Sequence, residues 1–337
     1  MKTVGIENAV GHVLAHDLTQ IIRGSFKGSR FKKGHVIVPE DIPVLKSMGK
    51  LNLYVLELDG GRLHENDAAR IIAECAKGSG VTLSEPNEGK IDFFAEFDGL
   101  LKIDEERLLR LLEEDDIMFA SLRGDRLVSK GEKIAGTRVI PLVVEKKVGD
   151  WAREVLTQPL IYVKPLKKLK IGLVTTGSEI KDGLIKDTFG PVMRDKFSEL
   201  SCDVTEQLFP GDDAQAISDS IKKCIQNGAE MVAVTGGMSV DPDDRTPAGI
   251  RLSGANVVSY GAPVLPGAMF MLAYFNDIPV VGLPGCVMFA RRTVFDLIVP
   301  RIVAGERPTK QDIKKLAQGG LCRGCEDCTF PRCGFGA

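Results

Sequence analysis

The stretch Lys170-Ile171-Gly172-Leu173-Val174-Thr175-Thr176-Gly177-Ser178-Glu179 decides the fold of the C-terminal half of the chain. Its apolar run predicts a buried strand over 170–175, and the small residues after it predict a turn. Further strands are predicted, separated by amphipathic helical stretches, at 204–209, 231–235, 257–260 and 279–283. This alternation predicts a three-layer α/β fold: a parallel sheet with helices on both faces.

The sequence also predicts where the helices between these strands begin and end. One carries an apolar stripe from Val192 to Leu200, and a second begins at the capping residue Asp213 and ends at Gly228. A long helix is predicted after residue 283, running through Phe289 and Ile298. In parallel sheets ligands bind beyond the carboxyl ends of the strands, so the turns at those ends are the first place to look for a site.

The rest of the chain divides by pattern into smaller parts. Short strands and turns, with a helix from Pro39 to Met48 and a strand over 51–58, predict a small β-rich N-terminal unit over 1–60. Residues 61–163 predict an α+β accessory region, with helices capped by Asn66 and Asp104 and strands at 127–128 and 139–144. A charged linker follows at 164–168, then the α/β domain at 169–305 and a cysteine-rich tail at 306–337.

Composition excludes several classes of protein. The 337 residues carry 44 basic and 46 acidic side chains, a net charge of −2, which argues against a generic nucleic-acid or anionic-membrane binder. The start of the chain lacks the apolar core of a secretory signal. The uncharged stretch 252–276 contains Pro263 and Pro266, so it does not predict a membrane-spanning helix. We expect a cytoplasmic protein whose scattered Cys75, Cys202, Cys224 and Cys286 stay thiols.

Three of the predicted strands end in turns rich in glycine and hydroxyl side chains. Glycine lets the backbone approach a ligand, and its N–H groups together with Thr and Ser hydroxyls favour a phosphate-bearing anion. The candidate ligand-binding residues in these turns are Thr176, Gly177, Ser178, Glu179, Gly236, Gly237, Met238, Ser239, Pro284 and Gly285.

Carboxylates gather at the same predicted edge. Asp187 precedes a helix, and Asp241, Asp243 and Asp244 follow the turn at 236–239. Acidic groups beside a phosphate would repel it unless a divalent cation lies between them, and Mg²⁺ bound by carboxylates and phosphate meets that need. The competing interpretation of Asp187 and Asp244 is helix capping.

Other mechanisms lack their residues. All four histidines lie in the first 64 residues, so a Ser-His-Asp or Cys-His mechanism built within the α/β domain is excluded. Neither a G-x-G-x-x-G after a strand nor a G-x-x-x-x-G-K-[ST] motif occurs. What remains is positioning and metal-assisted electrostatics on a phosphorylated ligand.

Taken together and in order, these motifs resemble the molybdopterin-binding domain family of molybdenum cofactor biosynthesis, over about residues 170–305. The residues that carry the resemblance are Thr175–Ile180, Asp187–Gly190, Thr235–Ser239, Pro266–Gly267 and Gly282–Gly285. The run Asp244-Arg245-Thr246-Pro247 is similar to the Asp-x-Thr-Pro pattern of the small adenylylating members. More weakly, Val10–Ala15 and Gly34–Ile37 resemble the leading region of the molybdotransferases.

The resemblance implies a ligand and roles for these residues. The ligand would be molybdopterin, its adenylylated form or the finished molybdenum cofactor, with its phosphate held by the first turn and by the Gly236-Gly237 turn, and with Pro266 and Gly267 part of the site. It also implies that Asp187 and Asp244 support Mg²⁺ or molybdate chemistry, helped by Glu179 of the first turn. Members of the family often self-associate, so a homo-oligomer is expected.

The tail carries the most distinctive local motif. Cys322, Cys325, Cys328 and Cys333 form two successive C-x-x-C steps and a fourth cysteine, a spacing that can hold one metal centre. A [4Fe–4S] cluster is the first interpretation, Zn²⁺ the second, and plain thiols or disulfides the third. The tail could serve structure, redox sensing or docking.

Two functional hypotheses therefore stand. In the first, the protein is an enzyme of cofactor maturation that uses Asp187, Asp241 or Asp244 with Mg²⁺ for adenylyl or molybdate transfer. In the second, it is a non-catalytic carrier, chaperone or sensor that delivers the cofactor to a molybdoenzyme. A third hypothesis is that the site binds another nucleotide or pyrophosphate ligand.

Overall fold

The structure is a computed structural model that describes residues 2–22, 26–56, 61–239 and 244–336. The chain divides into two compact units. The first comprises Met1–Glu96, Ile103–Leu122 and Gly131–Tyr162, and the second comprises Phe97–Lys102, Arg123–Lys130 and Val163–Ala337. The finer four-part division expected from sequence stays a prediction.

The start of the first unit consists of short strands around a small core, as the sequence predicted. A three-stranded antiparallel sheet has the order β1-β5-β2, and β3 pairs with β4 as a hairpin. Leu14, Leu45 and Val55 are fully buried between these elements. The elements are β1 (Lys2–Gly5), η1 (Ile6–Asn8), β2 (Val13–Leu14), β3 (Leu18–Ile22), β4 (Phe26–Phe31), α1 (Asp41–Ser47) and β5 (Asn52–Leu56).

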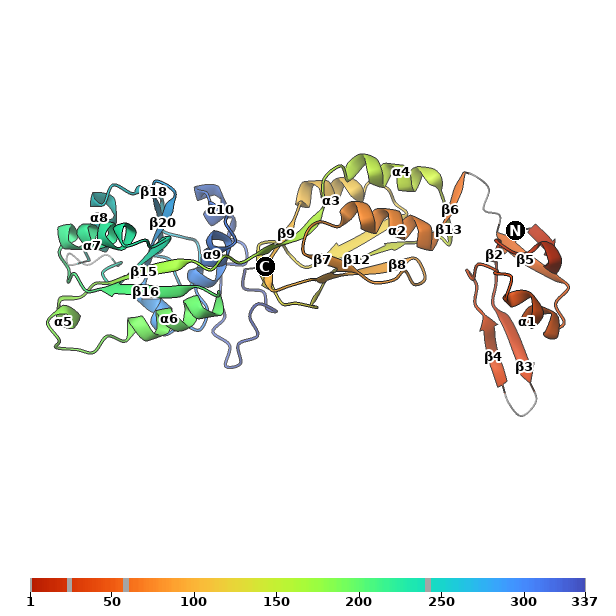
Figure 1. Cartoon of the computed structure of the whole chain (residues 1–337), viewed down its shortest axis with the longest axis horizontal. Coiled ribbons are helices and arrows are strands. Elements are labelled where there is room, and N and C mark those ends of the chain that lie inside the picture. Colours follow the sequence, from red (N-terminus) through yellow and green to blue (C-terminus); the bar gives the residue numbers. More distant parts are fainter. Residues whose placement is uncertain (1, 23–25, 57–60, 240–243, 337) are drawn as a thin grey trace. The chain divides into compact units, whose positions relative to one another are not determined.

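The remainder of the first unit is an antiparallel sheet covered by helices. The sheet has the order β10-β12-β8-β7, and helices lie along one side of it (Figure 1). Its elements are β6 (Arg62–His64), α2 (Glu65–Ala76), β7 (Val81–Leu83), β8 (Lys90–Ala95), α3 (Glu105–Leu111), β10 (Ile117–Ser121), β12 (Lys133–Val139), β13 (Val143–Glu145) and α4 (Lys146–Val155).

The caps of α2 and α3 test the sequence predictions directly. Asp104 caps α3 as predicted, because its carboxylate accepts a bond of 2.9 Å from the N–H of Arg107. The prediction that Asn66 caps α2 is wrong. His64 is the N-cap of α2, and its Nδ1 accepts a hydrogen bond of 3.2 Å from the N–H of Asn66. The Asn66 side chain instead accepts a bond from the N–H of Gly89.

The second unit contains the predicted α/β domain. Its six-stranded sheet has the order β16-β15-β17-β20-β19-β18. The strands are β15 (Lys170–Thr175), β16 (Asp203–Leu208), β17 (Met231–Thr235), β18 (Asn256–Tyr260), β19 (Met271–Phe275) and β20 (Ile278–Leu283). The helices are α5 (Ser178–Lys181), α6 (Phe189–Glu199), α7 (Ala214–Gln226), α8 (Thr246–Leu252), η2 (Gly285–Met288), α9 (Val294–Val303) and α10 (Lys310–Lys315).

Strand alternation produces two cores, one on each face of this sheet. Ile171 and Leu173 point to the face covered by α6 and α9, where Phe197 and Phe295 meet edge to face with ring centroids 5.2 Å apart. Val174 points to the opposite face, against α7 and α8. Figure 1 shows α7 and α8 on one side of the sheet and α6 on the other. The three-layer α/β fold is therefore confirmed.

The sheet departs from an all-parallel arrangement at one edge. β15, β16, β17 and β20 are parallel, but β19 is antiparallel to both β20 and β18. The reason is the two-residue connection Asn276-Asp277 between β19 and β20, which is too short for the crossover that a parallel pair requires. Asn276 adopts the left-handed backbone conformation that such a turn needs, with φ +53°.

The long helix predicted after β20 is also wrong in its bounds. A short 3₁₀ helix, η2, comes first, and α9 begins only at Val294 after the capping box of Thr293 and Asp296. Phe289, placed in that helix by the sequence, lies outside both and is 85% exposed. Periodicity alone did not reveal this interruption, because apolar residues continue through it.

The four scattered cysteines are free thiols, but only two of them are buried, since Cys75 and Cys286 are partly exposed. Cys202 and Cys224 are buried, and burial raises the pKa of Cys224 to about 12. Gly172 allows α7 to approach β15, since a Cβ there would lie 2.6 Å from the Cβ of Cys224. Among the residues described, no helix is both long enough and apolar enough to cross a membrane.

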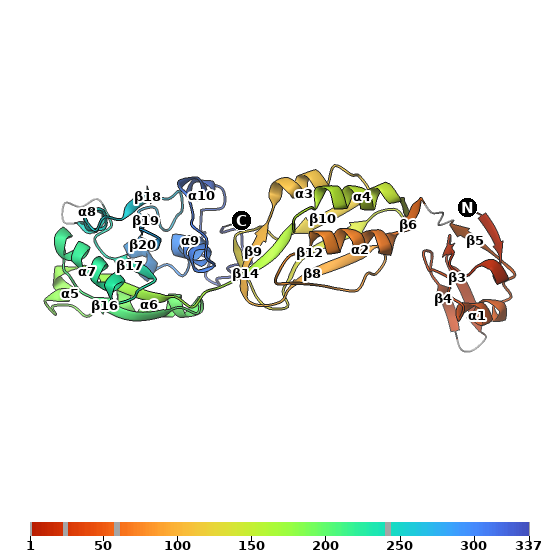
Figure 2. The ribbon, with the colours of Figure 1, turned by 45° about the horizontal axis from the view of Figure 1, so that its top comes forward.

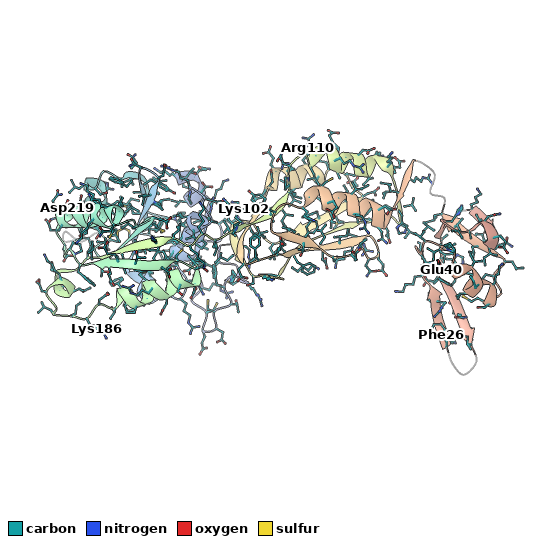
Figure 3. All side chains as sticks on the ribbon, in the orientation of Figure 1. Phe26, Glu40, Lys102, Arg110, Lys186 and Asp219 are labelled. Atoms are coloured by element: carbon teal, nitrogen blue, oxygen red, sulfur yellow. The ribbon has the colours of Figure 1, made fainter. Side chains whose placement is uncertain are left out.

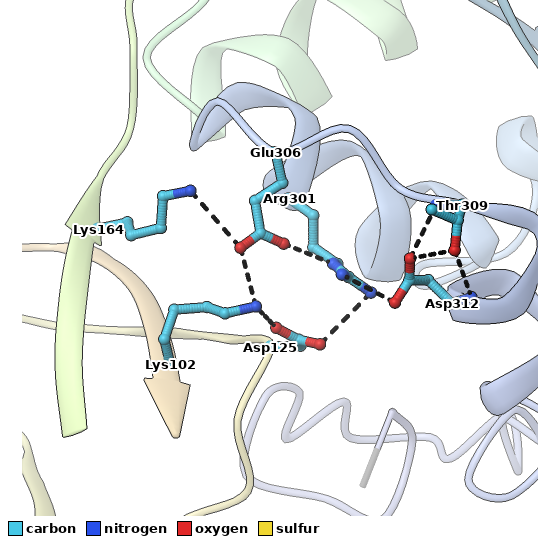
Figure 4. A network of polar contacts seen from close by, with 7 residues as sticks. All are labelled: Lys102, Asp125, Lys164, Arg301, Glu306, Thr309 and Asp312. Carbon is cyan, nitrogen blue, oxygen red and sulfur yellow. Dashed lines mark hydrogen bonds and ion pairs between the residues drawn. The ribbon is translucent and has the colours of Figure 1, made fainter. Parts of the chain in front are cut away.

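A polar network ties a small three-stranded sheet to α9 and α10. The sheet consists of β11 (Arg126–Val128), β9 (Gly99–Ile103) and β14 (Ile161–Pro165), so Lys164 and Pro165 end a strand where the sequence predicted a linker. Arg301 of α9 bonds Glu306 at 2.9 Å and contacts Asp125 and Asp312 at 3.4 Å (Figure 4). Glu306 also pairs with Lys102 at 2.8 Å and Lys164 at 3.5 Å.

The network shifts the pKa values of its acids. Burial alone would raise the pKa of Glu306, but the hydrogen bonds and positive charges of Lys102 and Arg301 outweigh it and hold the pKa below its ordinary value. The pKa of Asp312 is also lowered. Burial would raise this pKa, but the hydrogen bonds from Thr309 and the positive charge of Arg301 outweigh burial. Both carboxylates therefore stabilise the fold above their unfolded pKa and lose that effect as pH falls through the lowered folded value.

We predict that Glu306→Gln lowers the unfolding free energy of the second unit by about 2 kcal/mol at neutral pH, because Lys102 and Arg301 lose a charged partner in a half-buried site. The difference from wild type should shrink as the pH falls below about 4.3, the ordinary pKa of a glutamate in an unfolded chain, and vanish below the lowered pKa of the native carboxylate. Hydrogen exchange of the slowest-exchanging backbone amides of β17 and β20 measures this unfolding free energy. The exposed Asp277→Asn is the control, and an equal loss at all pH values would contradict the charge argument.

Candidate functional site

Strand register brings the three predicted turns to one edge of the sheet. In the pairing of β15 with β17, Thr175 lies opposite Thr235, and in the pairing of β17 with β20, Thr235 lies opposite Leu283. The chain then enters the turns at 176–179, 236–239 and 284–285, so all three lie at the carboxyl edge of the parallel strands. α5, which follows β15 directly, lies at this edge of the domain (Figure 2).

The antiparallel strands contribute one further loop to the same edge. Tyr260 is level with Met271, which is level with Gly282 near the end of β20. Residues 261–270, which join β18 to β19 and include Pro266 and Gly267, therefore lie beside the three turns. A Cβ at Gly267 would be 2.6 Å from Cγ1 of Val294, and the carbonyl of Pro266 accepts from the N–H of Val294. This pair anchors the loop to the start of α9.

Buried threonines hold the first and second turns together. The backbone N–H and the hydroxyl of Thr176 both donate to the carbonyl of Thr235, at 2.9 and 3.2 Å. The hydroxyl of Thr246, at the start of α8, donates to the carbonyl of Gly236 at 2.8 Å. All three threonines are at most 2% exposed, so these bonds form away from water and fix the relative position of the turns.

The Gly236-Gly237 turn requires glycine for two reasons. Both residues have positive φ, +86° and +52°. A Cβ on Gly236 would also lie 2.6 Å from Oγ1 of Thr176. Tyr260 supports the far side of the turn, because its hydroxyl donates to the carbonyl of Met238 at 3.1 Å. Sequence reasoning missed Tyr260, whose only signal is its position at the end of a strand.

Gly285 differs from these glycines. It is exposed, its φ is not in the left-handed region, and a Cβ built on it would meet nothing within 4 Å. Pro284 before it is buried. Packing therefore does not explain the glycine at position 285, and the space beside it is open at the carboxyl edge of the sheet.

Asp187 caps a helix. Its Oδ1 accepts from the N–H groups of Phe189 and Gly190 at 2.9 and 3.0 Å, and its Oδ2 accepts from Gly190 at 3.2 Å and from Nε2 of Gln207 at 2.7 Å. These contacts come from three donors, because the N–H of Gly190 is shared between the two oxygens. The geometry assigns Asp187 the capping role, and its catalytic role stays a prediction.

An aspartate from the loop between β16 and α7 contacts the first turn. Asp212, which sequence reasoning missed, accepts a bond of 2.7 Å from the N–H of Ser178 through its Oδ2. Glu179 is exposed in α5, and the segment after α5 leads past Lys186 to α6 (Figure 3). The first turn thus presents its own backbone to a carboxylate, the interaction that a bound anion would make.

Three aspartates follow the turn at 236–239, and the structure describes one of them, Asp244. Asp241 and Asp243 lie outside the described residues. Asp244 is half-buried, and its charge acts on Tyr260: burial raises the pKa of that phenol, Arg251 lowers it, and Asp244 raises it further. Asp244 is therefore placed near the Gly236-Gly237 turn.

The four tail cysteines lie around one cavity of about 220 Å³. Cys325 and Cys328 are exposed, and Cys322 and Cys333 are half-buried. Within the described ranges, no three His, Cys, Asp or Glu side chains are grouped closely enough to hold a metal ion, either here or at the strand edge.

Comparison with known proteins supports the family resemblance. Residues 172–304 match a family model described as "Probable molybdopterin binding domain", and residues 3–57 match one described as a domain of unknown function. The first match confirms the resemblance for the α/β domain and covers the three turns and the loop at 261–270.

Curated relatives extend the similarity beyond this domain. The chain is 22% identical over 300 residues to the molybdopterin molybdenumtransferases of Staphylococcus aureus strains MSSA476 and COL. The match covers 84% of this chain and 66% of the relatives, so the chain spans about two thirds of their length. A CinA-like protein of Mycobacterium avium strain 104 is 27% identical over 77 residues, 23% of this chain and 18% of the relative.

Solved structures with similar folds include two proteins named MoaB. The molybdopterin biosynthesis enzyme from Thermus thermophilus gives a TM-score of 0.34 at 17% identity, covering 41% of this chain and 98% of that one. The tungsten cofactor synthesizing protein from Pyrococcus furiosus gives a TM-score of 0.34 at 18% identity, covering 42% and 99%.

We predict that Gly236→Ala lowers the unfolding free energy of the second unit by about 2 kcal/mol or more, because a left-handed backbone and a steric clash with Thr176 act together. Gly285→Ala is the matched control and should change stability by no more than about 0.5 kcal/mol. Chemical denaturation, monitored by hydrogen exchange, measures the unfolding free energy of the two variants. Equal stability for both would mean that the turn relaxes and does not require glycine.

Proposed function

We propose that the α/β domain binds molybdopterin, its adenylylated form or the finished molybdenum cofactor, and that the protein acts in the synthesis or insertion of that cofactor. One observation carries the proposal most directly: strand register gathers the three glycine-rich turns and the loop at 261–270 at one sheet edge, within the residues that match the molybdopterin-binding family.

The phosphate of the pterin is assigned to the first and second turns. Successive backbone N–H groups of a turn can form an anion-binding nest, and Gly236 and Gly237, with positive φ and no side chains, suit such a turn. The exposed hydroxyls of Ser178 and Ser239 add donors beside it. Thr176 and Thr246 are buried and hold the turns in place, so we assign them a positioning role.

Mg²⁺ is assigned to the space between the phosphate and the acidic groups. A phosphate dianion beside Asp244 and Glu179 would be repelled without a cation, and carboxylate with phosphate oxygens is the ligand set that Mg²⁺ prefers. Asp241 stays a candidate for the same role. We assign Asp187 to positioning α6, because its oxygens already accept hydrogen bonds from Phe189, Gly190 and Gln207.

The open space at Gly285 is assigned to the ligand. A residue without a side chain at an exposed edge, with no packing reason for glycine, is suited to close approach by a bound molecule. Pro284 is buried and keeps this backbone in place. Self-association of the chain and contact with a molybdoenzyme remain further predictions.

We predict that molybdopterin binds the full chain in isothermal titration and binds more tightly with Mg²⁺. Gly285→Ala should weaken binding about tenfold, because a methyl group enters the ligand space while stability is unchanged. Asp244→Asn should remove most of the Mg²⁺ effect, since a neutral amide is a poorer Mg²⁺ ligand.

Asp219→Asn, an exposed change on α7 of the same domain, is the control and should bind as wild type. Absence of binding by both molybdopterin and its adenylylated form would contradict the proposal. Turnover of Mg-ATP or molybdate with bound molybdopterin would identify a transferase, whereas binding without turnover would identify a carrier.

A further inference from the structure

The proposed pterin site leaves the cysteine tail without a role. After α10, residues 316–336 form no helix or strand in the part described, apart from one bridge between Leu321 and Leu265. Yet Cys322, Cys325, Cys328 and Cys333 all line one cavity of about 220 Å³. All four are free thiols.

Both ends of the tail are anchored to the second unit. Cys322 donates its N–H to the carbonyl of Leu265 at 2.8 Å. Phe335 is 5% exposed and belongs to the core between the sheet and α9, and Cys333 packs against the same core. Arg126 also donates to the carbonyl of Pro331. The segment between these anchors carries the two exposed thiols, Cys325 and Cys328.

The walls of the cavity are basic and aromatic. Arg292 and Arg323 line it, and the Arg292 guanidinium lies 5.1 Å from the ring centroid of Phe330. Arg292 already forms ion pairs with Glu199 and Asp296, at 2.9 and 2.8 Å, so Arg323 is the guanidinium in this wall that would offset the negative charge of four thiolates. The apolar surface of Phe330 and Phe335 shields one side from water.

We propose that Cys322, Cys325, Cys328 and Cys333 hold a [4Fe–4S] cluster in this cavity. Each thiol releases its proton and binds one iron as thiolate, and two ferrous ions, two ferric ions and four sulfides supply the cluster core with no further change in oxidation state. A single zinc ion would require all four sulfurs to converge to about 2.3 Å from one point, whereas a cluster binds each sulfur at a different iron and needs less convergence within the cavity of about 220 Å³. The two C-x-x-C steps agree with this choice.

Binding requires a limited movement of the tail. The sulfurs surround the cavity but are not yet grouped closely enough to share a metal. Cys322 and Cys333 lie next to the anchors, so Cys325 and Cys328 are the residues that must turn inward. Gly324 lies between Cys322 and Cys325 with φ +63° and open space around its Cα, which leaves that segment free to adjust. Metal binding and ordering of the segment are thus coupled.

The test uses the full chain, purified without oxygen and reconstituted with equal amounts of ferrous and ferric iron together with sulfide. We expect about four iron and four acid-labile sulfide atoms per chain after gel filtration, and visible absorption that dithionite bleaches. Cys325→Ser and Cys328→Ser should each lose most of the iron. Both side chains are exposed, so their circular dichroism and thermal unfolding before reconstitution should match wild type.

Cys75→Ser is the matched control, because Cys75 lies in the first unit and should not affect iron content. Two results would overturn the proposal: zinc bound at one ion per chain without sulfide, or iron retained equally by wild type and both serine variants. Because the readout is metal content, it is independent of molybdopterin binding, and either assay can fail without the other.

Discussion

The in-register parallel pairing of β15, β17 and β20 is the constraint on which the rest of the site depends. Since Thr175, Thr235 and Leu283 are level, the chain leaves all three strands at the same edge. Bonds from Thr176 to the carbonyl of Thr235, and from Thr246 to that of Gly236, then set how the turns face one another. A shift of one residue in this register would separate the turns and reverse the two cores.

Sequence reasoning located this edge because it rests on local signals. Apolar runs predict the strands, small residues after them predict the turns, and Asp213 and Gly228 bound α7 as expected. It did not locate Asp212, Gln207 or Tyr260, whose contacts in the site come from elements distant in sequence. It also extended α9 through Phe289, because a 3₁₀ turn and a helix share apolar content, and it placed the cap of α2 two residues late.

The roles of the acidic residues changed most between sequence and structure. A carboxylate before a helix predicts either a cap or a metal ligand, and only the hydrogen-bond partners of Asp187 favour the cap. For the cysteine tail, in contrast, the sequence pattern itself indicates a metal site. Its cysteine spacing is informative in sequence, and the structure adds the shared cavity and the two arginines. Arg291, in the segment between Gly285 and α9, donates to the carbonyl of Glu326, so the tail contacts the chain that leaves the proposed pterin site.

Hydrogen–deuterium exchange of the full chain with and without molybdopterin and Mg²⁺ tests the central claim most directly, because it reports where the ligand binds. The account predicts slower exchange in peptides that contain Gly177–Glu179, Gly236–Ser239 and Gly285, with little change in the first unit. Unchanged exchange at all three turns under saturating ligand, or protection confined to other residues, would contradict it.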